Sequence, residues 1–267
     1  MTDFEKITSR DNQRLVRARK IRDGDNSEYI FVEGRRLVNE ALRSNIELVE
    51  CFASEEFDDQ EMVEALSERG PISILSSRLL QSIADTQQPQ GIVVIAKRPI
   101  TGFELRKTPI DDSRQKLPLF VFLKEINNPS NLGAIVRTAE AAGVSGIITS
   151  PRSADSFSPK GLRSAMGSTF RLPIWENVSF EEATDWAKRS GMQVVATEPS
   201  IGTIYTEIDW KIPSLIVFGS EAHGLTPSEI SAAGETITIQ LADGVESLNL
   251  AVSAGIILFE ARRQAGI

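Results

Sequence analysis

Cysteine, histidine and long apolar runs are nearly absent from this sequence of 267 residues. There is one cysteine, Cys51, and one histidine, His223. A single cysteine excludes an internal disulfide and a metal site built from several cysteines. A lone histidine without a partner histidine or aspartate nearby provides neither a metal site nor a proton relay, so we interpret His223 as incidental. We expect no bound metal, and we interpret Cys51 as a small buried residue of a strand.

No stretch of the chain is apolar for long enough to cross a bilayer. The longest apolar run is about seven residues, around Leu117–Leu123, whereas a membrane-spanning helix needs roughly 20. The first residues, MTDFEKITSRDNQ, lack the apolar stretch of a signal peptide. A content of 41% hydrophobic and 25% charged residues is typical of a folded globular protein. We therefore expect a cytoplasmic protein without a membrane partner.

Positive charge is scarce overall but concentrated near the N-terminus. The net charge is −8, which by itself disfavours a nucleic-acid partner. The charged residues of SRDNQRLVRARKIRD (9–23) are nevertheless mostly basic. Arg10, Arg14 and Arg17 follow the spacing i, i+4, i+7, which predicts one stripe along a helix of about residues 10–22. Because a guanidinium matches phosphate oxygens, this stripe is a candidate polyanion surface, and a solvated helix face is the alternative.

Helix and strand patterns alternate through most of the chain. In the first hundred residues, helical spacings such as that of 35–45 alternate with short apolar strands such as YIFVEG (29–34). Residues 101–116 have no sustained periodicity and mix charge with Pro and Gly, which is typical of a linker. The pattern then resumes. We predict a small α/β domain at 1–100 and a second α/β domain at 117–267, joined by this linker.

Near-continuous apolar strands between helices indicate that the second domain contains a parallel sheet covered on both faces. The expected strands are 117–126, 144–150, 192–199, 214–221 and 237–242, and the expected helices are 132–142, 158–170, 179–191 and 248–264. In such sheets, ligands bind at the carboxyl ends of the strands. Polar residues at those ends are therefore candidate site residues.

Three polar segments lie at such strand ends. They are NNPSNLGAIVRTAEAAGV (127–144), SLIVFGSEAHGL (214–225) and IQLADGVESLNLAVS (239–253). In the first, Ser130 or Asn131 is expected to cap the following helix. In the second, Glu221 lies between glycines that let the backbone approach a ligand. Each segment alone has a structural explanation, as a cap, a tight turn or a helix start, but their ordered combination is specific.

In this order, the segments resemble the SpoU (TrmH-type) family of the SPOUT class, which are S-adenosylmethionine-dependent RNA methyltransferases. The similar patterns are NxxNxGxxxRTAxAxG, a strand ending in GSExxGL, and VESLNLAVSxGIxLFE. The similarity covers roughly residues 116–267, including SADSFSPKGLRSAMGSTFRLPI (153–174). Residues 1–100, with ITSRDNQ and FVEGRRLVNEAL, resemble the small α/β substrate-binding domain that often precedes it.

The resemblance implies a fold, an assembly and a set of site residues. The implied catalytic domain is an α/β fold with a trefoil knot, in a homodimer whose site lies by the knot and the dimer interface. The implied reaction is methyl transfer to a ribose 2′-hydroxyl of RNA. The positions that match the family's active site are Asn131, Arg137, Glu221, Ser247 and Asn249. Those that match its cofactor contacts are Gly219, Ile239 and Leu248, with Thr197 as a further candidate, and Arg10, Arg14 and Arg17 would bind RNA.

The role of Arg137 is the main mechanistic question. In the family this arginine is the suspected proton acceptor, yet a guanidinium stays protonated in proteins. We favour the hypothesis that Arg137 anchors a phosphate of the target nucleotide and stabilises developing alkoxide charge. Ser247 and Asn249 would then orient the hydroxyl.

This chain departs from the family pattern in the loop before the third motif. The family commonly has Ile-Pro-Met where this chain has Ile239, Gln240 and Leu241. Its usual glycine before the serine is replaced by Asp243, with Gly244 one position later. These changes concern the cofactor loop and leave the polar residues of the third motif in place, so we interpret the site as active.

Three alternatives remain at the level of sequence. A Rossmann-type enzyme would need a G-x-G-x-x-G turn after a strand, and neither domain has one. A catalytically inert RNA-binding protein would need only the basic helix, but all five polar positions of the active site are present. Finally, the two-domain layout resembles enzymes that methylate ribosomal RNA more than single-domain tRNA enzymes. Ribosomal RNA is therefore the expected substrate, and tRNA is the alternative.

Overall fold

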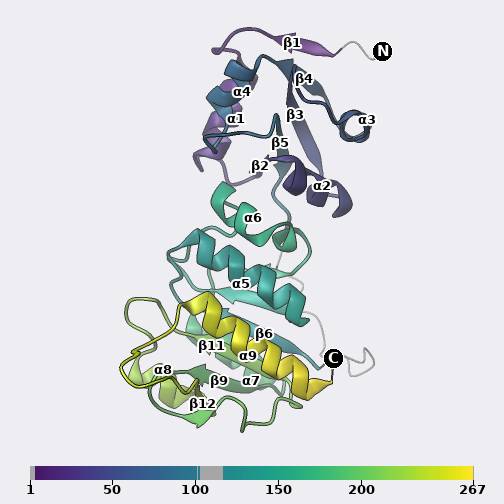
Figure 1. Cartoon of the computed structure of the whole chain (residues 1–267). Helices are drawn as coiled ribbons and strands as arrows, with labels where there is room; N and C mark the ends of the chain where they lie inside the picture. Colours follow the sequence, from purple (N-terminus) through teal and green to yellow (C-terminus); the bar gives the residue numbers. More distant parts are fainter. Residues whose placement is uncertain (1–3, 101, 103–116, 267) are drawn as a thin grey trace. The chain divides into compact units, whose positions relative to one another are not determined.

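The computed structural model describes residues 4–100, 102 and 117–266, which form two compact units (Figure 1). The first unit comprises the described residues up to Pro99 together with Ser156–Arg171. The second comprises the other described residues. Apart from Gly102, the predicted linker 101–116 lies outside the described residues.

The first unit is built on a mixed five-stranded sheet. Its strand order is β1 (Glu5–Ile7), β4 (Ile72–Leu75), β3 (Leu48–Ser54), β5 (Ile92–Lys97) and β2 (Tyr29–Glu33). The first three run parallel, whereas β5 is antiparallel to both β3 and β2. The short hydrophobic strands and the helices between them therefore form the α/β unit that the sequence predicts, with one reversed strand.

Helices cover both faces of this sheet. They are α1 (Gln13–Arg22), α2 (Arg35–Arg43), α3 (Gln60–Ser67) and α4 (Ser77–Ile83). Because successive side chains of a strand point to opposite faces, β5 contributes Val94 to the core beneath α2 and α3, and Val93 and Ile95 to the core beneath α1 and α4. Cys51 is fully buried in β3, and burial raises the pKa of its thiol to about 12. The interpretation of Cys51 as a buried strand residue is confirmed.

A segment from the second half of the sequence completes the first unit. Within Ser156–Arg171, which contains α6 (Pro159–Ala165), the side chains of Phe157 and Leu162 are buried in the core next to α2 and α3. Arg163 forms an ion pair with Asp85 at 2.6 Å. From the sequence we expect this segment in the second domain, because its helical pattern gives no indication of which hydrophobic core it joins.

The second unit is built on a seven-stranded sheet in which every described pairing is parallel. Its order is β10 (Thr203–Ile204), β12 (Glu235–Thr238), β9 (Gln193–Thr197), β11 (Ser214–Phe218), β6 (Leu119–Leu123), β7 (Gly146–Thr149) and β8 (Ile174–Trp175). All residues of β11 are buried, which explains its uninterrupted apolar sequence.

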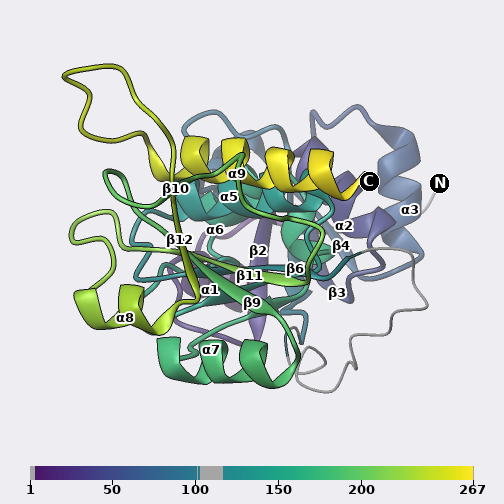
Figure 2. The ribbon, with the colours of Figure 1, turned by 90° about the horizontal axis from the view of Figure 1, so that it is seen from below.

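Helices lie on both faces of this second sheet (Figure 2). Helix α7 (Phe180–Arg189) packs on one face through Trp186, whose ring lies 5.0 Å from that of Phe120. Helices α5 (Pro129–Ala142) and α9 (Leu250–Ala265) lie together on the opposite face. The short α8 (Pro227–Ala232) follows β11. The predicted parallel sheet with two covered faces is therefore present.

None of the helices among the described residues combines the length and the apolar character that crossing a membrane requires.

Candidate active site

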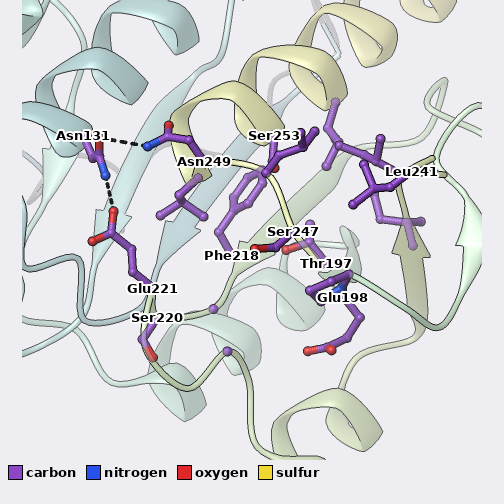
Figure 3. A pocket seen from close by; sticks show the side chains of 18 residues that line it. Asn131, Thr197, Glu198, Phe218, Ser220, Glu221, Leu241, Ser247, Asn249 and Ser253 are labelled. Atoms are coloured by element: carbon purple, nitrogen blue, oxygen red, sulfur yellow. Dashed lines mark hydrogen bonds between the residues drawn. The ribbon is translucent and has the colours of Figure 1, made fainter. Parts of the chain in front are cut away.

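The three polar segments come together at the carboxyl ends of β6, β9, β11 and β12. They line a cavity of about 560 Å³ within the second unit (Figure 3). Its lining includes eight of the predicted residues, namely Asn131, Thr197, Gly219, Glu221, Ile239, Ser247, Leu248 and Asn249. The rule that ligands of parallel sheets bind at strand ends thus places the cavity correctly.

Three side chains from distant segments form one hydrogen-bonded array. The Nδ2 of Asn249, at the start of α9, donates to the Oδ1 of Asn131 in the first turn of α5 at 3.4 Å. The Nδ2 of Asn131 in turn donates to the carboxylate of Glu221, in the loop after β11 (Figure 3). Each segment of the ordered trio contributes one member, so the array connects all three.

Local capping explains why the two asparagines point as they do. The side-chain oxygen of Asn249 accepts from the backbone N–H groups of Ala251 and Val252 at 2.9 and 3.3 Å, as the N-cap of α9. Helix α5 is capped by Asn128, whose Oδ1 accepts from the N–H of Ser130 at 2.9 Å. The prediction of Ser130 or Asn131 as the cap is therefore wrong. Because Asn128 is the cap, the side chain of Asn131 is left to join the array.

The loop after β11 folds back tightly on itself. Ser220 and Gly224 exchange backbone hydrogen bonds of 3.2 and 2.9 Å. A Cβ at Gly219 would lie 2.5 Å from the carbonyl carbon of Gly224, closer than real atoms approach. Glycine is required at position 219 by this turn. The same turn places Glu221 at the edge of the cavity.

Polar and apolar groups contribute about equally to the walls of the cavity. The side chain of Thr197 is held by a hydrogen bond from its hydroxyl to the carbonyl of Val217 on the adjacent strand, at 3.0 Å. Leu248 and Leu241 line the cavity from the loop between β12 and α9. The strand predicted at 237–242 ends at Thr238, so this loop begins at Ile239.

The departures from the family pattern lie mostly away from the cavity lining. Gln240 and Asp243 are exposed and do not line the cavity, whereas Leu241 does. Gly244 has a φ of +85°, a conformation that favours glycine, and a Cβ there would meet no atom within 4 Å. The displaced glycine therefore still permits a left-handed turn in the loop.

Arg137 lies outside this cavity. It is exposed on α5, and its side chain forms no ion pair or hydrogen bond in the part of the chain that the structure describes. The structure therefore brings together Asn131, Glu221, Ser247 and Asn249 but leaves Arg137 apart from them within one chain.

One carboxylate of the cavity was missed by the sequence analysis. Glu198 directly follows Thr197 at the end of β9 and lines the cavity. Burial raises the pKa of its carboxyl, and a hydrogen bond from the backbone of Leu225 opposes that effect. The strand-end rule that selected Thr197 applies equally to the next residue and would have found it.

The prediction that Arg10, Arg14 and Arg17 form one stripe along a helix is wrong. Arg10 precedes α1, which begins at Gln13. The guanidinium of Arg14 forms ion pairs with Glu50 and with Glu5, the latter at 2.7 Å. These acidic residues are distant in sequence, so spacing alone did not reveal that they neutralise Arg14.

Arg17 remains available on the surface. It is exposed, and its guanidinium lies 4.4 Å from the centre of the Tyr29 ring. A role for these arginines in RNA binding stays a prediction.

Comparison with known proteins identifies the family. The SpoU rRNA Methylase family model matches residues 118–259, which contain the array and the cavity. The chain belongs to this family. A second model, described as RNA 2'-O ribose methyltransferase substrate binding, matches residues 31–101. The SpoU match thus covers most of the second unit together with Ser156–Arg171 of the first, and the substrate-binding match covers most of the first unit.

Similar proteins match across both units. An uncharacterized tRNA/rRNA methyltransferase of Synechocystis is 35% identical over 72% of this chain and 67% of its own length. The 23S rRNA (guanosine(2553)-2'-O)-methyltransferase RlmP of Bacillus subtilis is 26% identical over 97% of this chain and 100% of its own. The crystal structure of an AdoMet-bound rRNA methyltransferase from Sinorhizobium meliloti has a TM-score of 0.85 at 30% identity, covering 97% and 98% of the two chains.

These matches confirm the predicted SpoU family, the α/β fold class, the RNA methyltransferase activity and S-adenosylmethionine as the cofactor. The cavity of this SpoU chain fits that cofactor. Its volume lies within the range of about 300–1,000 Å³ that is usual for small-ligand sites. It combines apolar side chains, which suit an adenine ring, with the backbone of Gly219 in its lining, which suits the polar edge of that ring. The carboxylate of Glu198 suits a cation. The trefoil knot stays a prediction.

Proposed function

We propose that this SpoU chain methylates a ribose 2′-hydroxyl in ribosomal RNA. The observation that carries the proposal is the array of Asn249, Asn131 and Glu221 at the edge of a cavity that fits S-adenosylmethionine. The Bacillus subtilis and Sinorhizobium meliloti relatives, both named as rRNA methyltransferases and both matching nearly the whole chain, support ribosomal RNA as the substrate. Transfer RNA is the alternative, since the Synechocystis relative is named for both.

The cofactor would be held by the loop between β12 and α9 and by the ends of β9 and β11. Ile239, Leu241 and Leu248 would contact its adenine, and the turn at Gly219 would supply backbone groups. When bound, S-adenosylmethionine supplies a methyl group on a sulfonium that is already a good leaving group. The chain therefore has to align the attacking oxygen and accommodate its proton.

The polar residues of the array would position the ribose. The carboxylate of Glu221 accepts a hydrogen bond from the Nδ2 of Asn131, and the Oδ1 of Asn131 accepts one from the Nδ2 of Asn249. Neither asparagine side chain therefore rotates freely. Ser247 lines the same cavity two residues before Asn249. We propose that Ser247 and Asn249 orient the 2′-hydroxyl and that Glu221 holds Asn131 in place. Such fixed geometry lowers the barrier without a strong base.

The proposed role of Arg137 requires a second copy of the chain. Val252 and Phe259 on α9 are 51% and 48% exposed and lie seven residues apart, which places them on one side of the helix. Helix α5, which carries Arg137, packs beside α9. We propose that these two helices form a homodimer interface and that Arg137 serves the cavity of the partner subunit. There it would bind a phosphate of the target nucleotide through its planar guanidinium.

The test is methylation of deproteinised total RNA with methyl-labelled S-adenosylmethionine, followed by separation by size and mapping of alkali-resistant linkages. We expect label in large ribosomal RNA, at linkages that resist alkali because the 2′-oxygen is blocked. Label confined to tRNA would overturn the choice of RNA, and label on a base would overturn ribose specificity. Binding of the labelled cofactor without any transfer would favour an inert RNA-binding protein. A cytoplasmic location stays a prediction from the sequence.

A further inference from the structure

Strands β1 and β4 and helix α4 lie near one another in the first unit (Figure 1). Residues of these elements line a second cavity. It measures about 570 Å³. Its lining comes from β1 and the residues after it, from the end of β4 and from α4. The cavity described for methyl transfer belongs to the second unit, so this one is a separate feature.

The rim of this cavity is positively charged. Lys6, Arg10 and Arg78 line it, against the single carboxylate of Glu55. Lys6 Nζ lies 3.6 Å from an oxygen of Glu55, and both side chains are exposed. Arg10 and Arg78 are exposed too, and their side chains form no ion pair with another residue among those described. On a chain of net charge −8, this excess positive charge is local to the cavity.

Arg14 shows that not every arginine of the unit keeps an unpaired charge. Arg14 is paired with Glu5 and Glu50, so its charge is largely neutralised. Arg10 and Arg78 keep theirs. A polyanion approaching the first unit would therefore be attracted to Arg10 and Arg78, and to the exposed Arg17 of α1, more than to Arg14.

The buried and half-buried residues of the lining, which we call its floor, are apolar, and hydroxyl groups also line the cavity. Ile7 is buried, and Ile74 and Leu79 are half-buried. Ser76 and Ser82 carry such hydroxyl groups. An apolar floor suits the face of a base, while hydroxyl and guanidinium groups suit sugar and phosphate. A base inside a duplex is stacked and paired, so only an unstacked nucleotide could enter such a cavity.

We propose that this cavity holds one unstacked nucleotide of the RNA substrate. Arg10 and Arg78 bind the flanking phosphates, and the base rests on Ile74 and Leu79. The proposal rests on the proposed function in that the ligand is taken to be RNA. The match of residues 31–101 to an RNA substrate-binding family supports it, because β4 and α4 lie inside that match.

The test uses the full chain and a fluorescein-labelled oligouridylate, with binding measured by fluorescence anisotropy over a range of salt concentrations. The variants are Arg10→Gln, Arg78→Gln and the double variant. Arg36→Gln is the matched control, because Arg36 is an exposed arginine of the same unit that does not line the cavity. Thermal unfolding and calorimetric binding of S-adenosylmethionine check that the fold and the methyl-transfer cavity are intact.

We expect the double variant to raise the Kd for oligouridylate about tenfold or more. If two phosphate contacts are lost, the slope of log K against log salt should become shallower by about 1.4, at roughly 0.7 for each contact to a single strand. Arg36→Gln should leave Kd unchanged, and a fully paired RNA duplex should compete poorly with the oligouridylate. An RNA carrying 4-thiouridine should cross-link to peptides containing residues 6–10 or 74–82.

Two outcomes would overturn the proposal while leaving the methyltransferase assignment in place. One is a double variant whose KM for RNA in the methylation assay equals that of the wild type. The other is an equal loss of binding in Arg36→Gln, which would show a general effect of charge. If the wild-type chain neither binds nor methylates RNA, the proposed function itself fails, and this inference fails with it.

Discussion

The amide of Asn131 is the centre of the candidate site, because it contacts Asn249 on one side and Glu221 on the other. A shift of about 1 Å in reacting groups can cost about 100-fold in rate, since alignment supplies much of the acceleration. We therefore expect Asn131→Ala to lower the rate of single-turnover methyl transfer by about 100-fold. Binding of S-adenosylmethionine, measured by calorimetry, should change much less, because the apolar residues of the walls remain.

The control for this variant is Ser130→Ala. Ser130 is the adjacent residue on α5, does not line the cavity, and contributes only its backbone N–H to the cap formed by Asn128. It should transfer methyl groups at the wild-type rate. An Asn131→Ala variant with unchanged transfer would show that the array is structural only.

Residue-level patterns identified most of the site correctly, and the exceptions share a cause. The strand-end rule and the family motifs selected Asn131, Glu221, Ser247 and Asn249, which the structure brings to one cavity. The same patterns gave no indication that Arg137 lies apart from them. A residue's position along a helix follows from spacing, but the surface it faces depends on which element packs beside that helix.

At the scale of elements, α8 is held by one partly buried ion pair. Lys124 Nζ at the end of β6 lies 2.6 Å from Glu229 of α8, and both side chains are at most 15% exposed. Glu229 also closes a capping box with Thr226. Burial alone would raise the pKa of Glu229, but the hydrogen bonds from Lys124 and Thr226 together lower it.

We expect Glu229→Gln to reduce the free energy of unfolding by about 1.5–3 kcal/mol at neutral pH, the usual contribution of hydrogen bonds to a charged group. A lowered carboxyl pKa means that this stabilisation is present above the ordinary glutamate pKa and is lost as pH falls through the native value. Urea unfolding at neutral and acidic pH should therefore show that the difference in free energy of unfolding between the wild type and Glu229→Gln becomes smaller in acid. Glu235→Gln, at an exposed residue, is the control and should change the free energy of unfolding little. If the difference between the wild type and Glu229→Gln did not depend on pH, the ion-pair explanation would be contradicted.

The helix N-caps show which local features neighbouring residues predict. Ser158 and Ser179 cap α6 and α7, in line with the preference for serine at this position. The cap of α5 was wrong because the run Asn-Asn-Pro-Ser-Asn offers several capping side chains, and Pro129 at the first helical position selects Asn128. In α5 and α6 alike, the cap is the residue directly before the proline that starts the helix.

At the scale of the whole molecule, the first unit depends on a segment that follows β7 in the chain. Leu162 is fully buried in its core among residues of the N-terminal region. We expect Leu162→Ala to reduce the stability of the first unit by about 2–5 kcal/mol, the usual cost of truncating a buried leucine. Hydrogen exchange should show faster opening of β2 and β5. Protection lost only in the second unit would contradict the assignment of this segment.

The proposed dimer predicts complementation between two inactive variants. If Arg137 serves the partner's cavity, a dimer of one Asn131→Ala subunit and one Arg137→Gln subunit retains one intact site, whereas each homodimer retains none. After random mixing of the two, about a quarter of wild-type activity should return. Mixing each variant with buffer alone is the control. No recovery, with dimers present by light scattering, would place Arg137 in the cavity of its own chain.

The sequence by itself determined the class of fold, the strand ends that carry the chemistry and the family. These follow from periodicity and from short motifs, which report on residues close together in the chain. Only the tertiary structure decided that Glu50 neutralises Arg14, that Ser156–Arg171 joins the first core and that Arg137 stays outside the cavity formed by its own chain. Each of these depends on which surfaces from distant parts of the sequence pack together. The spacing of residues along the chain does not indicate which surfaces these are.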